Sequence, residues 1–470
     1  MRRTSTIRKV GVVILGVLVP ALARANFCAQ DQVPAATLLF PYVVVDVDTT
    51  GTPDAGGQTT ITRIINVVRY ALIVHFTAWD ATGTPQIDFD EVLSGYDVLE
   101  INWRDFLNGR FDLFDTSKNA FPFGSAPYTF DPFEWGPDGR GQPTTGATLT
   151  TAQHRNAITT AQCGTVPPYG NRTDLAATIR SLLTGALVAR EHTGCGPSTW
   201  PRADKTWFGV ALTASPVFFY VTADVVSACN LKFPSDAIYW TTYATTANVL
   251  VGDVIYLNAR SNTSEMMPAV HVEAVSRLDG GPSVFGFYEE RSGAETNREP
   301  LGTAFMVGYG TDRAAGISSN LIFWKNFTEL DAVDKVVDCG SYLYYAFDMD
   351  GRSLSTSPMF CDSGPCVRLD PNQLPFATPK VPLSNAYFDL PGQYGFMLIV
   401  LPPSYGQSYA DPTPDGRGYL QRPTMGWAAW QFDYGGYSAG AEGITLANPL
   451  CFPAQVLPDL GVNPGAVPVR

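Results

Sequence analysis

The chain has 470 residues and carries 44 Asp and Glu against 31 Lys and Arg, which gives a formal net charge of −13. A chain this acidic lacks the basic face that nucleic-acid phosphates require, so we expect no nucleic-acid partner. Its length exceeds what one ordinary hydrophobic core supports, which predicts either one large elaborated domain or two to three domains.

Residues 1–25 have the parts of a cleavable secretory signal peptide. Four basic residues precede position 10, residues 10–22 are almost wholly apolar, and Ala23-Arg24-Ala25 places small residues at the cleavage positions. We expect a mature chain that begins at Asn26 and is secreted, to the periplasm or the extracellular cell surface. Cleavage removes five basic and no acidic residues, leaving 26 basic against 44 acidic residues and a net charge of −18.

The apolar part of this leader is too short to span a bilayer, and no later stretch has about 18 uninterrupted apolar residues. We therefore expect no transmembrane segment after the signal peptide is removed. Eight cysteines follow the leader, an even number that disulfide bonds explain most simply in an exported chain. The disulfide candidates are Cys28, Cys163, Cys195, Cys229, Cys339, Cys361, Cys366 and Cys451. Only two of them are close together, with no histidine nearby, so a zinc site is disfavoured.

Short segments rich in Val, Ile, Phe, Tyr and Thr recur along the chain, separated by turns that contain Gly and Pro. This spacing predicts a mainly β fold, an antiparallel β-sandwich that is either one large elaborated sandwich or two sandwiches. In chain order we expect sandwich strands at 26–108, a Gly- and Pro-rich insertion at 109–204, further sandwich strands at 205–310 and a C-terminal β-rich region at 311–470.

The insertion contains one predicted helix, at about residues 174–190. Leu175, Ile179 and Leu183 fall on one face of it, and the residues just before it can accept hydrogen bonds from the free amides of the first turn. We expect the apolar face of this helix to pack against the rest of the protein.

Five stretches spread over most of the chain resemble segments of a group of uncharacterised, secreted, strand-rich bacterial proteins. They are residues 33–46, 95–106, 248–258, 270–274 and 297–301. No known activity is attached to that group. The resemblance therefore implies a shared secreted fold and assigns no catalytic residue.

One motif with a known catalytic role occurs, Gly436-Tyr437-Ser438-Ala439-Gly440, which matches the Gly-x-Ser-x-Gly nucleophile elbow. An elbow needs a parallel strand before it, a helix after it and a downstream histidine as base. All four histidines, His75, His154, His192 and His271, lie upstream. We expect the match to be fortuitous and predict no catalytic residue.

His75 and His271 alternate with apolar residues inside predicted strands, which is typical of a core histidine paired to a neighbour. His271 and Glu273 fall on the same face of their strand, where a metal or acid–base pair would have to begin. The better metal candidate is Ca²⁺, with Asp46, Asp48, Thr50 and Asp54 as oxygen ligands around a glycine turn. The closing glutamate of a full calcium loop is absent, and Asp and Gly also serve hairpin turns without a metal.

Two loops, at residues 121–139 and 402–419, combine aromatic rings with Gly, Pro and acids. Aromatic faces beside carboxylates bind sugars, but the same composition suits a long loop that buries its own rings. The candidate ligand-binding residues are Phe123, Tyr128, Phe130, Trp135, Tyr405, Tyr409 and Tyr419.

These patterns support two hypotheses. The first is an exported, non-enzymatic β-sandwich protein with a structural or binding role at the cell surface or in the periplasm, with a surface polysaccharide or a protein as its partner. The alternative is a carbohydrate-binding or carbohydrate-active protein that uses the aromatic loops.

Overall fold

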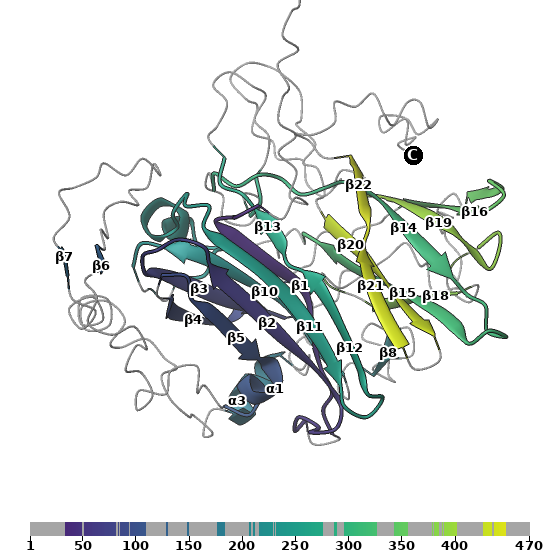
Figure 1. The fold of residues 1–470 in the computed structure, drawn as a ribbon, viewed down its shortest axis with the longest axis horizontal. Helices are drawn as coiled ribbons and strands as arrows, with labels where there is room; N and C mark the ends of the chain where they lie inside the picture. Colours follow the sequence, from purple (N-terminus) through teal and green to yellow (C-terminus); the bar gives the residue numbers. More distant parts are fainter. Residues whose placement is uncertain are drawn as a thin grey trace, which may run out of the picture.

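The structure is a computed structural model, and most of the chain that it describes is antiparallel β-strand (Figure 1). The mainly β, sandwich-like fold expected from the sequence is thereby confirmed. The described residues are 33–48, 51–80, 83, 85–93, 95–109, 128–129, 148–149, 176–183, 206–207, 210–211, 216–228, 230, 232–275, 286–288, 296–326, 343–355, 378, 380–384, 388, 390–401, 426–434 and 437–447.

The strands form four large sheets, numbered I to IV, and two short two-stranded pairs. Sheet I consists, in spatial order, of β13 (Val270–Val272), β1 (Thr37–Val45), β10 (Val217–Val226), β3 (Leu72–Trp79) and β4 (Pro85–Leu93). Sheet II consists of β12 (Thr263–Pro268), β11 (Leu250–Asn258), β2 (Gln58–Asn66) and β5 (Val98–Asn102).

Sheet III consists of β17 (Ser353–Ser355), β16 (Leu343–Asp348), β19 (Tyr394–Val400), β14 (Ala304–Gly310) and β22 (Ile444–Ala447). Sheet IV consists of β18 (Lys380–Leu383), β15 (Ile317–Lys325), β20 (Gly426–Tyr434) and β21 (Tyr437–Glu442). The short pairs join β6 (Tyr128–Thr129) to β7 (Thr148–Leu149) and β8 (Thr206–Trp207) to β9 (Val210–Ala211).

Sheets I and II pack face to face as the first sandwich. On β11, Leu250, Val254 and Tyr256 are buried and alternate with partly exposed residues, as in a strand with one face on a core. All nine residues of β1 are buried, because sheet I is covered on both faces. A β carbon at Gly252 would lie only 2.7 Å from Leu38 Cδ1, so glycine permits the close approach of β11 and β1.

Sheets III and IV form the second sandwich, with a core of their own between them. The opposite face of sheet IV carries Ile322 and Trp324 on β15 and their cross-strand partners Ala429 and Trp427 on β20. These four side chains belong to the core of the first sandwich, where the Trp324 ring lies 5.7 Å from the ring of Tyr220 on β10. One apolar core therefore fixes the two sandwiches side by side (Figure 1).

Two short helices close the first sandwich at one end. Trp103 and Phe106 of α1 (Trp103–Leu107) are buried, and the Trp103 indole donates to Thr62 Oγ1 over 3.1 Å. Helix α3 (Ala176–Leu183) lies within the helix expected in the insertion, and its Ile179 and Leu183 join the first core. Residues 174–175 and 184–190 of the expected helix lie outside the described residues.

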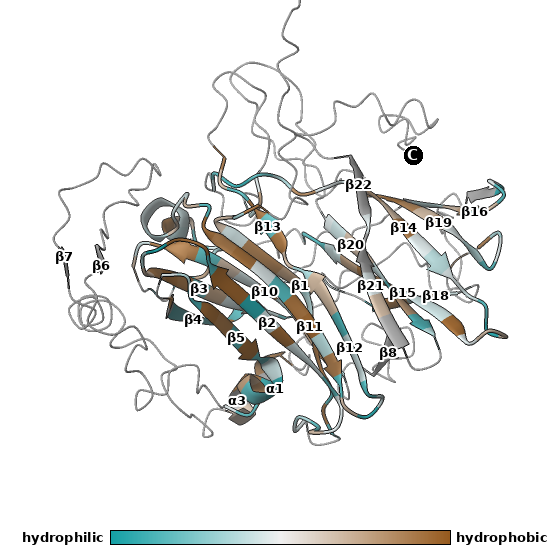
Figure 2. Ribbon diagram, viewed as in Figure 1, coloured by the Kyte–Doolittle hydropathy of each residue, from teal (hydrophilic) through white to brown (hydrophobic). Residues whose placement is uncertain are grey.

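The strands of the first sandwich come from both sides of residues 109–204, and those of the second follow residue 303. Figure 2 shows β3 and β5 as largely apolar, whereas β12, at the junction of the sandwiches, carries more hydrophilic residues. In the parts of the chain that the structure describes, no helix combines the length and apolar character needed to cross a membrane.

Candidate functional site

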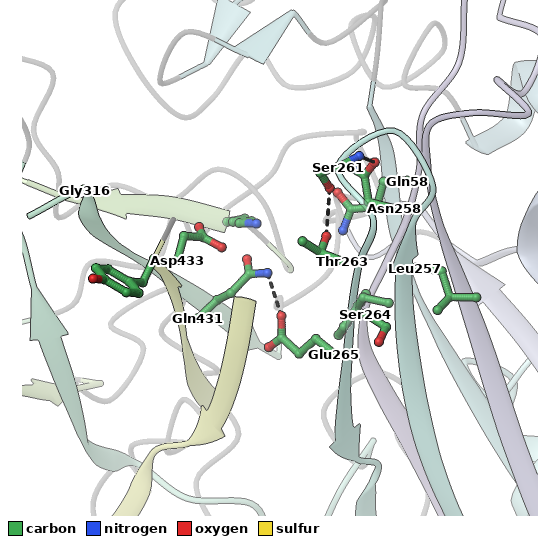
Figure 3. Close-up of a pocket in the computed structure, with 13 residues that line it drawn as sticks. Gln58, Leu257, Asn258, Ser261, Thr263, Ser264, Glu265, Gly316, Gln431 and Asp433 are labelled. Carbon is green, nitrogen blue, oxygen red and sulfur yellow. Dashed lines mark hydrogen bonds between the residues drawn. The ribbon is translucent and has the colours of Figure 1, made fainter. Parts of the chain in front are cut away.

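A cleft opens at the junction of the sandwiches, where β11 and β12 of the first face β18 and β20 of the second (Figure 3). Its volume is about 340 Å³, which is in the range of small-molecule sites. Its lining is mostly hydrogen-bonding side chains. The lining residues are Gln58, Tyr256, Leu257, Asn258, Ser261, Thr263, Ser264, Glu265, Gly316, Lys380, Gln431, Asp433 and Tyr434.

The polar wall from the second sandwich follows from the sequence of β20. Alternate residues of a strand point to opposite faces, so Trp427, Ala429, Gln431 and Asp433 share the face turned to the first sandwich. Along this face the residues change from apolar to polar. The apolar end, with Trp427, is sealed into the common core, and the polar end opens as the cleft.

A hydrogen bond crosses the cleft between the sandwiches. Gln431 Nε2 on β20 donates to Glu265 Oε2 on β12 over 2.6 Å, and both side chains are buried (Figure 3). Gly440 on β21 lies against this contact, because a β carbon there would collide with Glu265 Oε1 and would lie 2.8 Å from Met267 Sδ. Glycine at position 440 therefore allows the edge strands β21 and β12 to approach each other.

This placement explains the Gly-x-Ser-x-Gly match without catalysis. Residues 437–442 form β21, which pairs antiparallel with β20 and is followed by the strand β22 rather than by a helix. The strand–turn–helix context of a nucleophile elbow is therefore missing in the described part of the motif. Its last glycine serves the packing of two strands.

In the part of the lining that the structure describes, three charged groups face the cleft: Glu265, Asp433 and Lys380. Burial lowers the pKa of Lys380, and the negative charges of Asp433, Glu265 and Asp46 oppose this effect. Among the described residues, no hydrogen bond or ion pair engages Lys380 Nζ. Asp433 Oδ2 accepts a hydrogen bond from Asn320 Nδ2 over 3.1 Å, which fixes this carboxylate on sheet IV.

The first sandwich contributes hydroxyl and amide groups to the opposite wall. Ser261 Oγ and Thr263 Oγ1 are hydrogen-bonded to each other at 2.8 Å, and Asn258 Oδ1 holds the hairpin by accepting from the amide of Ser261 over 3.1 Å. Tyr434, which ends β20, is 51% exposed, but it alternates with Asp433 and so points to the face of sheet IV opposite the first sandwich. Among the described residues, the cleft thus combines donors, acceptors and a single ammonium group.

A second concentration of polar groups is buried on sheet I. Asp90, His75, Asp224 and Thr37 are successive cross-strand partners on β4, β3, β10 and β1, so their side chains form one row, which we call the polar row. His75 Nδ1 lies 2.9 Å from Asp90 Oδ1, and both side chains are fully buried. The hydroxyl of Thr37 donates to Asp224 Oδ1.

The polar row is covered by Tyr239, in a single π-helical turn η4 (Tyr239–Tyr243), and by Arg298. Tyr239 donates to Asp224 Oδ2 over 3.0 Å, and Arg298 Nε donates to Thr37 Oγ1 over 2.7 Å. Burial lowers the pKa of His75, but the hydrogen bond and charge of Asp90 and the charges of Asp88 and Asp224 raise the pKa above its usual value. Since water does not reach these groups, we interpret the row as structural.

His271 also has a structural role, because it binds a backbone amide. Its Nε2 accepts a hydrogen bond from the amide of Gly252 over 3.2 Å, and burial lowers its pKa to about 4. Nearby, the amide of Glu273 donates to Glu299 Oε1 over 2.9 Å. In the described residues, His271 thus acts as a neutral acceptor rather than as the start of a metal site.

The described candidate calcium ligands on the 46–58 hairpin stabilise its backbone by accepting hydrogen bonds from backbone amides. Asp46 Oδ2 accepts from the amide of Gln58 over 2.8 Å, Asp48 Oδ1 from Thr52 over 2.9 Å, and Asp54 Oδ1 from Gly56 over 2.8 Å. Thr50 lies outside the described residues. In the described ranges, no three His, Cys, Asp or Glu side chains gather as a metal site, and the calcium loop stays a prediction.

All eight cysteines lie outside the described residues, as do the aromatic candidates except Tyr128, whose backbone belongs to β6. The cleft residues were not predicted from the sequence. The one sequence signal for the cleft is the change from apolar to polar residues along one face of β20, and this change matches no known motif.

Together the fold and the cleft define a mainly β protein of two joined sandwiches with a polar cleft at their junction. No family model, no curated protein and no solved structure matches the chain.

Proposed function

We propose that this is an exported, non-enzymatic binding protein that holds a carbohydrate in the cleft between its two sandwiches. One observation carries the proposal: strands of both sandwiches line a single cleft with hydrogen-bonding side chains.

The lining suits sugar hydroxyls because each hydroxyl both donates and accepts a hydrogen bond. Gln58, Asn258 and Gln431 supply amide groups with both capacities, and Glu265 and Asp433 supply acceptors. A strongly apolar ligand would leave these polar groups without partners, at a cost in affinity.

Binding is favoured over catalysis by how the polar groups are held. The described lining contains no His or Cys. Glu265 accepts a hydrogen bond from Gln431, and Asp433 accepts one from Asn320. The strands that carry these carboxylates also contribute residues to the core of the first sandwich. Such side chains are preorganised for a ligand, which lowers the entropy cost of binding.

Export is supported by the leader-like residues 1–25 and by the even number of cysteines that follow. A secreted or periplasmic protein meets polysaccharides directly, so this location agrees with a carbohydrate ligand. A surface polysaccharide is accordingly the partner that we propose.

The test is a glycan array, followed by isothermal titration calorimetry, on protein that begins at Asn26. We expect binding to a defined glycan, and we expect Gln58→Ala and Asp433→Ala each to weaken it about tenfold or more. Asp350→Ala is the matched control, because Asp350 is exposed and lies outside the cleft. Absence of glycan binding, or equal binding by the cleft variants and the wild type, would reject the proposal.

A further inference from the structure

We infer that the cleft selects an uncharged sugar, one of whose ring hydroxyls bridges the ammonium of Lys380 and a carboxylate of Glu265 or Asp433. This inference rests on the proposed function and adds the charge class of the ligand. It follows from an imbalance of charge at the junction of the sandwiches.

Lys380 is the single cation of the described lining, and two carboxylates line the same cleft. A third carboxylate, that of Asp46 at the end of β1, also lies within electrostatic reach of Lys380. The surroundings of the amine are therefore net negative. The whole chain has the same sign, with 44 acidic residues against 31 basic ones.

An anionic ligand is disfavoured in such a cleft. A uronate, sulfate or phosphate that approached Lys380 would also approach Glu265 and Asp433, and like charges placed together in a partly desolvated site oppose binding. The negative field of the protein would further slow its association. A ligand ammonium group is attracted by these carboxylates, but it is repelled by Lys380 and has no lone pair that could accept a hydrogen bond from Lys380.

A hydroxyl group satisfies both kinds of protein group at once. It accepts a hydrogen bond from an ammonium through its lone pairs and donates its own proton to a carboxylate. Both bonds are charge-assisted and thus stronger than bonds between neutral groups. Lys380 Nζ has no hydrogen bond or ion pair among the described residues, so its donors are available to such a ligand.

The positions of these groups agree with a bridging ligand. Lys380 and Asp433 lie on β18 and β20, the two strands that flank β15 in sheet IV, and Glu265 lies on β12 of the first sandwich. Figure 3 shows Gln431, Asp433 and Glu265 turned toward the same space from the two sandwiches. A sugar ring in this space would therefore contact charged groups of both sandwiches.

The experiment compares each oligosaccharide backbone in three charge states. Glucose- and galactose-based oligosaccharides are titrated in their neutral form, as the C6-oxidised uronates and as the 2-amino forms, at about 0.15 M salt, where distant charges are largely screened. We expect the neutral form to bind about tenfold or more tightly than either charged form.

Variants then identify the groups responsible. Lys380→Met removes the charge but keeps most of the length, and we expect it to weaken binding of the neutral sugar about tenfold. Asp433→Asn keeps the shape, and we expect it to weaken the neutral sugar while improving the uronate. Lys232→Met is the matched control, since Lys232 is 45% exposed and pairs with Asp236 away from the cleft. Melting temperatures show whether each variant is folded.

Two failures are distinguishable. If a uronate binds better than the neutral form, or if folded Lys380→Met and Asp433→Asn both bind the neutral sugar as tightly as the wild type, the inference on charge is wrong and the proposed function stands. If none of the three charge states binds, and the array is also negative, the proposed function falls with it.

Discussion

Gln431 of β20 and Glu265 of β12 join the two sandwiches through a hydrogen bond of 2.6 Å between Nε2 and Oε2. The bond lies where the apolar junction around Trp427 gives way to the open cleft. Since the carboxylate is held from the second sandwich, the shape of the cleft depends on the contact between the sandwiches. Changes at this junction should therefore affect both stability and ligand binding.

Gly440→Ala tests this dependence. The new β carbon would collide with Glu265 Oε1, and the neighbouring Met267 Sδ is also close, so Glu265 or β21 has to move. We expect a loss of about 1–3 kcal/mol in the free energy of unfolding, the usual cost of overpacking, together with weaker glycan binding. Chemical denaturation and calorimetry measure the two effects.

Gly56→Ala is the control for this variant. Its β carbon would meet only Asp54 Oδ1, at 3.6 Å, which is an ordinary contact. We expect its stability and binding to stay close to those of the wild type. If Gly440→Ala behaves like Gly56→Ala, then β21 and β12 do not pack as the structure describes.

The common core predicts that the sandwiches unfold together. Trp427 and Trp324 are cross-strand partners on sheet IV but pack into the core of the first sandwich. We expect one calorimetric transition for the wild type. Trp427→Ala should cost about 3–5 kcal/mol and should split the transition in two, because it removes the contact that couples the sandwiches. Two separate transitions in the wild type, or a single one in Trp427→Ala, would contradict this.

Local pattern was enough to predict the fold class. On β11 the buried residues Leu250, Val254 and Tyr256 recur at even spacing, and that alternation is visible in the sequence. It was not enough for the cleft, whose two central residues, Glu265 and Gln431, are 166 positions apart. Their meeting depends on how the edges of two sheets pack, which no local period encodes.

Of the predicted aromatic candidates, the structure describes only the backbone of Tyr128 in β6, so the sugar-binding loops stay a prediction. The described cleft is lined by polar side chains on strands, such as Asp433 and Lys380. A polar residue on a strand looks like ordinary solvent exposure in sequence. Its role appears only when a second sandwich covers that face. Similarly, the cross-strand partners of His75 depend on the registers of two strand pairs.

The pair of His75 and Asp90 should be strongly coupled, because both side chains are fully buried at 2.9 Å. Removal of one partner, as in His75→Leu or Asp90→Leu, leaves an uncompensated polar group and should cost about 3–5 kcal/mol. The double variant should cost clearly less than the sum of the two single variants, as measured by a double-mutant cycle in urea.

The exposed pair of Lys232 and Asp236 provides the comparison. These side chains are 45% and 35% exposed, at a distance of 3.1 Å, so solvent screens their attraction. We expect no measurable coupling in their cycle. Coupling of the same size in both cycles would show that burial does not strengthen the His75–Asp90 interaction.

The free energy of unfolding should depend on pH through the titration of His271. Its pKa in the folded protein is about 4, below the usual 6.5, so the unfolded chain binds an additional proton between these values. The contribution of His271 is therefore present at neutral pH and is lost as the pH falls from about 6.5 to about 4. The full shift corresponds to roughly 3 kcal/mol.

His271→Gln isolates this effect. Glutamine can accept the hydrogen bond from the amide of Gly252 but does not titrate, and all other groups cancel in the difference between variant and wild type. We expect the wild type to lose stability relative to His271→Gln as the pH is lowered, in urea denaturation at a series of pH values.

His75→Gln should give the opposite slope, because the pKa of His75 is raised in the folded protein. The stability that His75 contributes is present at low pH and is lost as the pH rises through that raised pKa. Equal slopes for the two variants would contradict opposite pKa shifts of His271 and His75 in the folded protein.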